Sequence, residues 1–158
     1  MCKVLIIDDD QAIRTVLSTI LNGTHSITTA KSAEEAEMLI GLFEPDVIVL
    51  DYRLPSGVSG LEFLRRLPKN RPEVIVVTGS GADSELRSSL LRAGALYVVS
   101  KPYDLEELRV MIEKASRYHR ACSMLNGVEE LQSGALLDNL RRSVRELELS
   151  RGIANGNR

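Results

Sequence analysis

Five short runs rich in valine and isoleucine recur at nearly even spacing through the first hundred residues. Four of them are apolar at every position and do not alternate apolar with polar residues, which is typical of strands covered on both faces in a parallel sheet. The second run, Ser-Ile-Thr-Thr, is more polar, and we expect it at an edge of the sheet. The five runs lie at residues 4–7, 26–29, 47–50, 74–77 and 97–99.

Helical patterns fill the intervals between these runs, with apolar residues three and four positions apart. Asp10, Ser32 and Asp104 stand where a capping residue begins a helix, and Ser32 forms a capping box with Glu35. Strands that alternate with helices predict a doubly wound α/β fold built on a five-stranded parallel sheet. The predicted helices cover residues 13–21, 33–42, 61–67, 86–93 and 105–115.

The alternation of strands and helices stops at about Ala121. We therefore predict one domain over residues 1–120, a joint over 121–127, a helix for linkage or dimerisation over 128–150, and disorder over 151–158. Two architectures stay open for the extra helix. It belongs either to a stand-alone domain that uses it to dimerise or dock, or to a fragment of a larger regulator.

Composition narrows the class of protein. The chain has 158 residues, 20 basic and 22 acidic side chains, and a formal net charge of −2, which argues against direct nucleic-acid binding. Its two cysteines are too few for a disulfide framework or a four-cysteine zinc site. The N-terminus does not resemble a signal peptide, and no apolar run is long enough to cross a membrane. We expect a soluble cytoplasmic protein.

Polar side chains follow four of the five predicted strands directly. Because the carboxyl ends of parallel strands meet at one edge of a sheet, we expect these side chains to converge there. Several carboxylates at one edge repel one another, so a cation is needed to offset the repulsion. The residues are Asp8, Asp9 and Asp10 after the first strand, Asp51 after the third, Thr78 after the fourth, and Ser100, Lys101 and Pro102 after the fifth.

Oxygen ligands in small number suit Mg²⁺, which keeps several of its waters. A metal bound by Asp8, Asp9 and Asp51 leaves coordination positions for a phosphoryl oxygen, and Thr78 and Lys101 can contact the other phosphoryl oxygens. An ionised Asp51 can then act as the nucleophile and form an aspartyl phosphate. The sequence therefore predicts phosphoryl transfer at this edge.

Taken together, these residues resemble the receiver domain of two-component response regulators, over essentially residues 1–120. The resemblance implies a flavodoxin-like sheet of strand order 2-1-3-4-5, a phosphoacceptor at Asp51, phosphoryl contacts from Thr78 and Lys101, and a cis Lys-Pro bond. It also implies a histidine kinase as phosphoryl donor, and a regulatory domain that is not an enzyme but assists its own phosphorylation and dephosphorylation. The implied Mg²⁺ ligands are Asp8, Asp9, Asp51 and the backbone carbonyl of Arg53. The motifs are Ile-Ile-Asp-Asp-Asp ending at Asp10, Asp-Tyr-Arg-Leu-Pro-Ser-Gly from Asp51 with Gly60 beyond it, Val-Thr-Gly around Thr78, and Lys101-Pro102.

One position departs from the family's pattern. Many receivers carry Tyr or Phe three residues before the lysine, as a ring that turns inward on phosphorylation, and Val98 stands there. Tyr97 is one residue earlier, and adjacent strand residues point to opposite faces. Either the register slips by one residue or the protein switches without the ring, and we favour the second reading.

Two other functions compete with a receiver. An aspartate-nucleophile phosphohydrolase of the haloacid dehalogenase type would use Asp8-x-Asp10, but that reading leaves Asp51 without a role. A pseudo-receiver that only docks partners would not need the full set of acids, threonine and lysine. For a receiver, we expect the face formed by the helix at 86–93, the strand at 97–99 and the helix at 105–115 to switch and to mediate dimerisation or effector control. The candidate contacts on that face are Arg87, Arg92, Tyr97, Tyr103 and Glu107.

Overall fold

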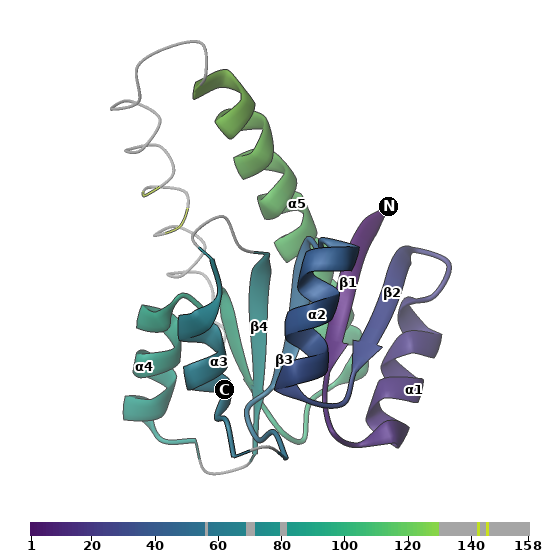
Figure 1. Ribbon diagram of the computed structural model, residues 1–158, viewed down its shortest axis with the longest axis vertical. Coiled ribbons are helices and arrows are strands. Elements are labelled where there is room, and N and C mark those ends of the chain that lie inside the picture. Colours follow the sequence, from purple (N-terminus) through teal and green to yellow (C-terminus); the bar gives the residue numbers. More distant parts are fainter. Residues whose placement is uncertain (56, 69–71, 80–81, 130–141, 143–144, 146–158) are drawn as a thin grey trace. The chain divides into compact units, whose positions relative to one another are not determined.

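The computed structural model describes residues 1–55, 57–68, 72–79, 82–129, 142 and 145. Contacts divide the chain into two compact units, Met1–Ser116 and Arg117–Arg158. The first unit contains one sheet of five parallel strands in the order β2-β1-β3-β4-β5 (Figure 1). This confirms the predicted sheet and its strand order. The strands are β1 (Cys2–Ile7), β2 (His25–Ala30), β3 (Val47–Asp51), β4 (Glu73–Thr78) and β5 (Tyr97–Ser100).

Five helices connect and follow the strands, and local side-chain chemistry sets where they begin. Asp10 caps the first helix by accepting from the amides of Ala12 and Ile13, and Ser59 forms a capping box with Glu62 at the third. The helices are α1 (Gln11–Leu21), α2 (Ala33–Phe43), α3 (Gly60–Arg66), α4 (Ser84–Ala93) and α5 (Leu105–Glu129).

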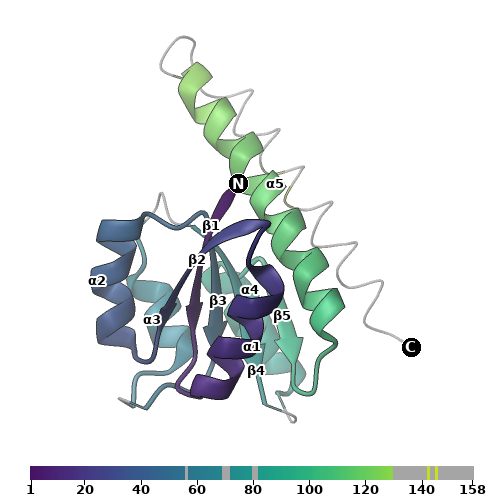
Figure 2. The ribbon, with the colours of Figure 1, turned by 90° about the vertical axis from the view of Figure 1, so that its right-hand side faces the viewer.

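The sheet is covered on both faces, which explains its apolar strands. Figure 2 shows α2 and α3 on one side of the sheet and α1 on the other. Leu90 of α4 belongs to the same buried cluster as Phe63 of α3 and Ala36 of α2, so these three helices share a face. Leu17 of α1 is 4% exposed, and Ile112 in the first part of α5 is fully buried. The most polar strand, β2, lies at an edge, as its sequence predicted.

The fifth helix is longer than its pattern predicted. It continues past residue 115 to Glu129, so residues 121–127, which were predicted as a joint, are helical. An asparagine and a glycine there favoured a break, but a single glycine costs a helix interior only about 1 kcal/mol relative to alanine. Most of the predicted helix over 128–150, and all of the predicted disorder over 151–158, lie outside the described residues. Within the described part of the chain, no helix has the length and apolar character needed to span a membrane.

Candidate phosphorylation site

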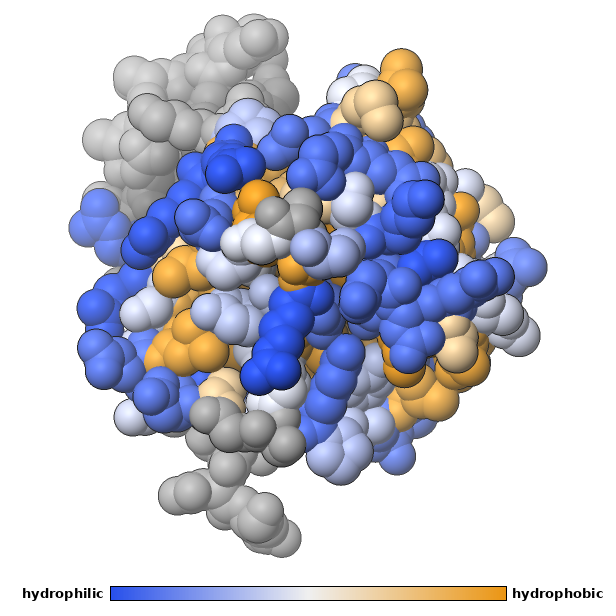
Figure 3. Space-filling view, turned by 60° about the horizontal axis from the view of Figure 1, so that its bottom comes forward, coloured by the Kyte–Doolittle hydropathy of each residue, from blue (hydrophilic) through white to orange (hydrophobic). Residues whose placement is uncertain are grey.

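The site lies at the edge of the sheet where the strands end. Asp51 and Thr78 are the last residues of β3 and β4, while Asp8 and Asp9 follow β1 and Lys101 follows β5. Parallel pairing brings these strand ends to the same edge, as the sequence predicted. Figure 3 shows this end of the molecule, with hydrophilic residues gathered over its centre.

Three of the predicted metal ligands form one cluster. Asp8, Asp9 and Asp51 each offer a carboxylate oxygen, and these oxygens lie within 4.8 Å of one another. Asp8 and Asp51 are buried, at 5% and 7% exposure, while Asp9 is exposed. Like charges at this separation disfavour simultaneous ionisation unless a cation lies nearby. The cluster is therefore suited to binding a cation.

Lys101 supplies one positive charge. Its Nζ atom lies 2.8 Å from Oδ1 of Asp51 and 3.4 Å from Oδ2 of Asp8. Burial works against the charged ammonium, but the two carboxylates outweigh burial and raise the pKa of Lys101 above its ordinary value. Burial also raises the pKa of Asp8, and the charge of Asp51 adds to this effect. One lysine therefore does not fully compensate the buried acids.

Backbone amides hold the two buried carboxylates in place. The amide of Asp10 donates to Oδ1 of Asp8 at 2.8 Å, and the amide of Arg53 donates to Oδ2 of Asp51 at 3.1 Å. Asp51 is thus contacted on one oxygen by Arg53 and on the other by Lys101. The contact that Arg53 makes at this site comes from its amide. Metal binding by the Arg53 carbonyl therefore stays a prediction.

Thr78 connects the site to the edge strand β5. Its side chain is buried, and its hydroxyl donates to the carbonyl of Val99 at 3.4 Å. The amide of Lys101 donates to the carbonyl of Thr78 at 2.7 Å, and the Lys101–Pro102 bond is cis. Strands β4 and β5 are therefore tied together directly beside the acidic cluster.

The register of β5 bears on the missing ring. Val98 pairs with Val76 and belongs to the buried cluster that contains Leu90 of α4. Tyr97 pairs with Ile75, one position earlier, and so points to the opposite face of the strand. The register has not slipped to place Tyr97 where Val98 was expected.

Two residues near the site were not predicted as part of it. Burial raises the pKa of the Tyr103 phenol, and the charges of Lys101, Asp8 and Asp51 also act on it, so this ring lies within electrostatic reach of the cluster. Arg14 of α1 donates to the carbonyls of Asp8 and Asp9. The sequence pattern predicts neither feature, because each depends on the direction that a long side chain takes in the fold.

The donor set fits a hard divalent cation. The three clustered ligands are all carboxylate oxygens, and two of them are already oriented by other contacts. Mg²⁺ prefers oxygen ligands and is commonly bound by one or two carboxylates, waters and a phosphate oxygen. The residues present are therefore compatible with the metal that the sequence predicted.

Known proteins of one family match the chain in sequence and in structure. The model of the response regulator receiver domain matches residues 4–113. The chain is 40% identical over 109 residues to a protein-glutamate methylesterase/protein-glutamine glutaminase of Burkholderia thailandensis, covering 65% of this chain and 30% of that protein. It is 34% identical over 122 residues to the KDP operon transcriptional regulatory protein KdpE of Escherichia coli, covering 77% of this chain and 54% of that protein.

The receiver domain of NtrX from Brucella abortus has the same fold, with a TM-score of 0.66 and 30% identity over 72% of this chain and 98% of that one. This chain spans only about a third to a half of the two full-length relatives just named. With the family match over residues 4–113, the chain belongs to the response regulator receiver family of two-component systems.

Proposed function

We propose that Asp51 accepts a phosphoryl group from a histidine kinase, with Mg²⁺ bound by Asp8, Asp9, Asp51 and the backbone carbonyl of Arg53. The observation that carries this proposal is the arrangement around Asp51. Its carboxylate is buried beside two further acids and contacted at 2.8 Å by the Lys101 ammonium. A purely structural ion pair does not call for three clustered carboxylates.

In this reaction an oxygen of the Asp51 carboxylate donates its electron pair to phosphorus. The bond between phosphorus and the donor's imidazole nitrogen breaks, and its electron pair returns to the imidazole. The Arg53 amide orients one Asp51 oxygen. Lys101 is placed to pair with the incoming phosphoryl group, and bound Mg²⁺ supplies further neutralisation of its charge.

We propose that the face formed by α4, β5 and the first part of α5 responds to phosphorylation. Support comes from a continuous set of contacts along β5. Thr78 contacts Val99 beside the site, and Arg87 of α4 donates to the carbonyl of Val98 at 2.9 Å and to the hydroxyl of Ser100 at 3.3 Å. A shift of Thr78 toward the phosphoryl group would change the strand to which Arg87 is bound. No aromatic side chain is needed at Val98 for this route.

The output of the switch is dimerisation through this face or the C-terminal helix, or control of an effector. The effector is either a separate partner or a further domain of the same protein. Relatives such as the methylesterase extend well beyond the receiver match, which supports the second arrangement. We propose no enzymatic activity other than the receiver's part in its own phosphorylation and dephosphorylation.

The phosphohydrolase alternative is weaker for a specific reason. It assigns Asp10 to catalysis, but Oδ1 of Asp10 accepts from two amides at the start of α1, at 2.8 and 3.4 Å. This contact occupies Asp10 as a helix cap. The docking-only alternative predicts that Asp51 accepts no phosphoryl group, and a phosphorylation assay distinguishes it from the proposal.

The test is the intact mass of the protein after incubation with acetyl phosphate and Mg²⁺. We expect one phosphoryl adduct that requires the metal and is absent from Asp51→Asn. Asp83→Asn is the matched control, because the Asp83 side chain caps α4 by accepting from the Leu86 amide, and asparagine caps about equally well. An adduct on Asp51→Asn would refute the assignment. A folded wild type that accepts no phosphoryl group from acetyl phosphate or from a phosphohistidine donor would favour the docking-only alternative.

A further inference from the structure

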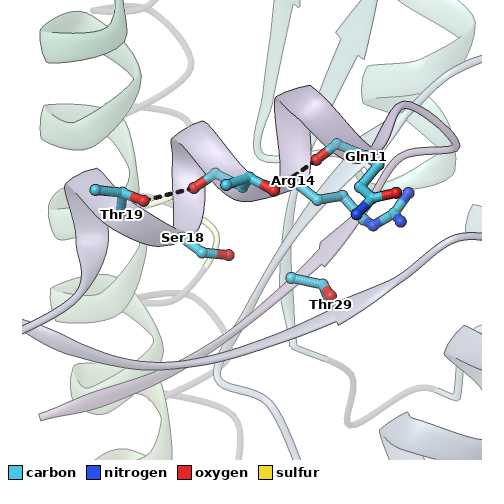
Figure 4. A pocket seen from close by; sticks show the side chains of 6 residues that line it. Gln11, Arg14, Ser18, Thr19 and Thr29 are labelled. Atoms are coloured by element: carbon cyan, nitrogen blue, oxygen red, sulfur yellow. Dashed lines mark hydrogen bonds between the residues drawn. The ribbon is translucent and has the colours of Figure 1, made fainter.

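Arg14 contacts the loop that carries two of the three clustered acids. It lies in α1, and its Nη1 atom donates to the carbonyl of Asp8 at 2.8 Å and to the carbonyl of Asp9 at 3.0 Å. Figure 4 shows its side chain leaving α1 beside that of Gln11, in a polar groove between α1 and β2. One guanidinium therefore joins two successive carbonyls between β1 and α1.

The other contacts of this loop do not fix both acids. Oδ1 of Asp8 is held by the Asp10 amide, and Asp10 is held as the cap of α1. Asp9 is exposed, and no hydrogen bond or ion pair among the described residues fixes its carboxylate. The position of Asp9 therefore depends on its backbone, and Arg14 contacts that backbone at the carbonyl.

The Arg14 contacts differ in kind from those of Lys101. Lys101 pairs with carboxylate oxygens, so it competes with a metal for the same atoms. The described donations of Arg14 go to main-chain carbonyls, which leaves the carboxylate oxygens accessible to a cation. Partners that orient metal ligands without contacting the metal commonly change its affinity about ten- to a hundredfold when they are removed.

We infer that Arg14 is a positioning residue that holds the Asp8 and Asp9 carboxylates in the arrangement that binds Mg²⁺, an inference that rests on the proposed function. It does not contact the phosphoryl group. Its loss therefore weakens metal binding but leaves phosphoryl transfer intact once the metal is saturating. Lysine at this position keeps a positively charged donor but lacks the planar guanidinium that directs Nη1 at both carbonyls, so we expect it to restore binding only in part.

The experiment compares wild type with Arg14→Ala, Arg14→Lys and the control Thr15→Ala. The Thr15 hydroxyl donates to the Gln11 carbonyl on the same helix, so its described hydrogen bond lies within α1 and not on the loop. Mg²⁺ affinity is measured by calorimetry, and amide exchange of the loop is measured without metal. We expect the Mg²⁺ Kd to rise about tenfold or more in Arg14→Ala, to rise less in Arg14→Lys, and to stay unchanged in Thr15→Ala. The Asp9 and Asp10 amides should exchange faster in Arg14→Ala, and its acetyl phosphate adduct should return to wild-type yield at saturating Mg²⁺.

Three results would overturn the inference. A Kd within about twofold of wild type in Arg14→Ala, with a normal wild-type adduct on Asp51, refutes positioning while the proposed function stands. An adduct deficit that persists at saturating Mg²⁺ shows that Arg14 acts on the transfer step itself. A wild type that neither binds Mg²⁺ nor forms the adduct removes the proposed function, and the inference with it.

Discussion

Replacing Asp8 by asparagine should stabilise the metal-free protein while abolishing most of its response to Mg²⁺. Asp8 is buried, and its raised pKa means that the ionised form is disfavoured in the folded state. The carboxamide has nearly the same shape, and its oxygen can still accept from the Asp10 amide, which donates to Oδ1 at 2.8 Å. The substitution therefore removes the charge and keeps the packing.

Opposing interactions act on the Asp8 charge, and burial, which disfavours that charge, is the largest of them. The Asp10 amide and Lys101 favour the charge, while Asp51 disfavours it. Asp51, with an oxygen at most 4.8 Å away, repels the Asp8 charge by at least about 3.5 kcal/mol at an effective dielectric constant of about 20. Lys101 at 3.4 Å attracts it by about 5 kcal/mol, but the lysine side chain is 34% exposed and is shared with Asp51, which reduces this attraction. Burial of the carboxylate remains, and we expect Asp8→Asn to raise the free energy of unfolding by about 1–2 kcal/mol.

Urea unfolding near neutral pH, with EDTA or with Mg²⁺, measures this difference. In EDTA the variant should be the more stable protein. Mg²⁺ at about a hundred times its Kd adds about 2.7 kcal/mol to a protein that binds it, so the wild type should then reach or pass the variant. Asp83→Asn, at the cap of α4, should shift neither value.

The pH dependence gives a second check with a fixed sign. Because the pKa of Asp8 is higher in the folded state than the ordinary value of 3.8, the folded wild type binds its proton more tightly than the unfolded chain does. The advantage of the variant in EDTA should therefore be full above the folded pKa and should shrink as pH falls toward 3.8. A variant less stable than wild type in EDTA at neutral pH would show that the Asp8 charge stabilises the fold, and would refute this reasoning.

Two further substitutions test the surroundings of the site. Gly60→Ala should lower the free energy of unfolding, measured by urea titration, by about 1–3 kcal/mol, because the new Cβ would lie 2.9 Å from the backbone Cα of Tyr52. The control Gly41→Ala, whose new Cβ would lie in open space on α2, should not lower it. Arg87→Ala should still form the Asp51 adduct, but amide exchange in α4 and β5 should become about tenfold faster, because the contacts of Arg87 with β5 are lost. The control Arg92→Ala, on the same helix, should not change the exchange rates. Equal exchange in the two variants would contradict the proposed role of Arg87.

The sequence predicted the sheet and the convergence of the site well because both depend on local and periodic signals. Continuous apolar runs indicate strands buried on both faces, and the first polar residue after each run marks its end. In a parallel sheet those ends meet at one edge, so Asp8, Asp51, Thr78 and Lys101 could be grouped without knowing any distance. The length of α5 was less accessible, since Asn126 and Gly127 weaken a helix without ending it.

The contacts of long side chains could not be predicted in this way. Arg14 and Arg87 each reach across to the backbone of another segment, and neither contact follows from spacing along the chain. A position in a helix pattern says which face a residue occupies, but an arginine on that face can extend in several directions. The sequence therefore places Arg87 only among the candidate contacts of the switching face and assigns Arg14 no role, whereas in the structure each donates to the backbone of another segment.

The acidic cluster also explains why stability and binding should oppose each other here. Asp8 and Asp51 are buried close together, and in the described part of the chain Lys101 pairs with both of them. Burying these charges close together is unfavourable. Hydrogen bonds from backbone amides and from Arg14 offset part of this by holding the acids and their loop in place. Functional sites commonly contain residues that lower the stability of the fold but are needed for binding. We expect Asp8 to be such a residue, because it destabilises the metal-free protein and is a predicted metal ligand. Asp8→Asn separates these two effects, since it relieves the first and removes the second.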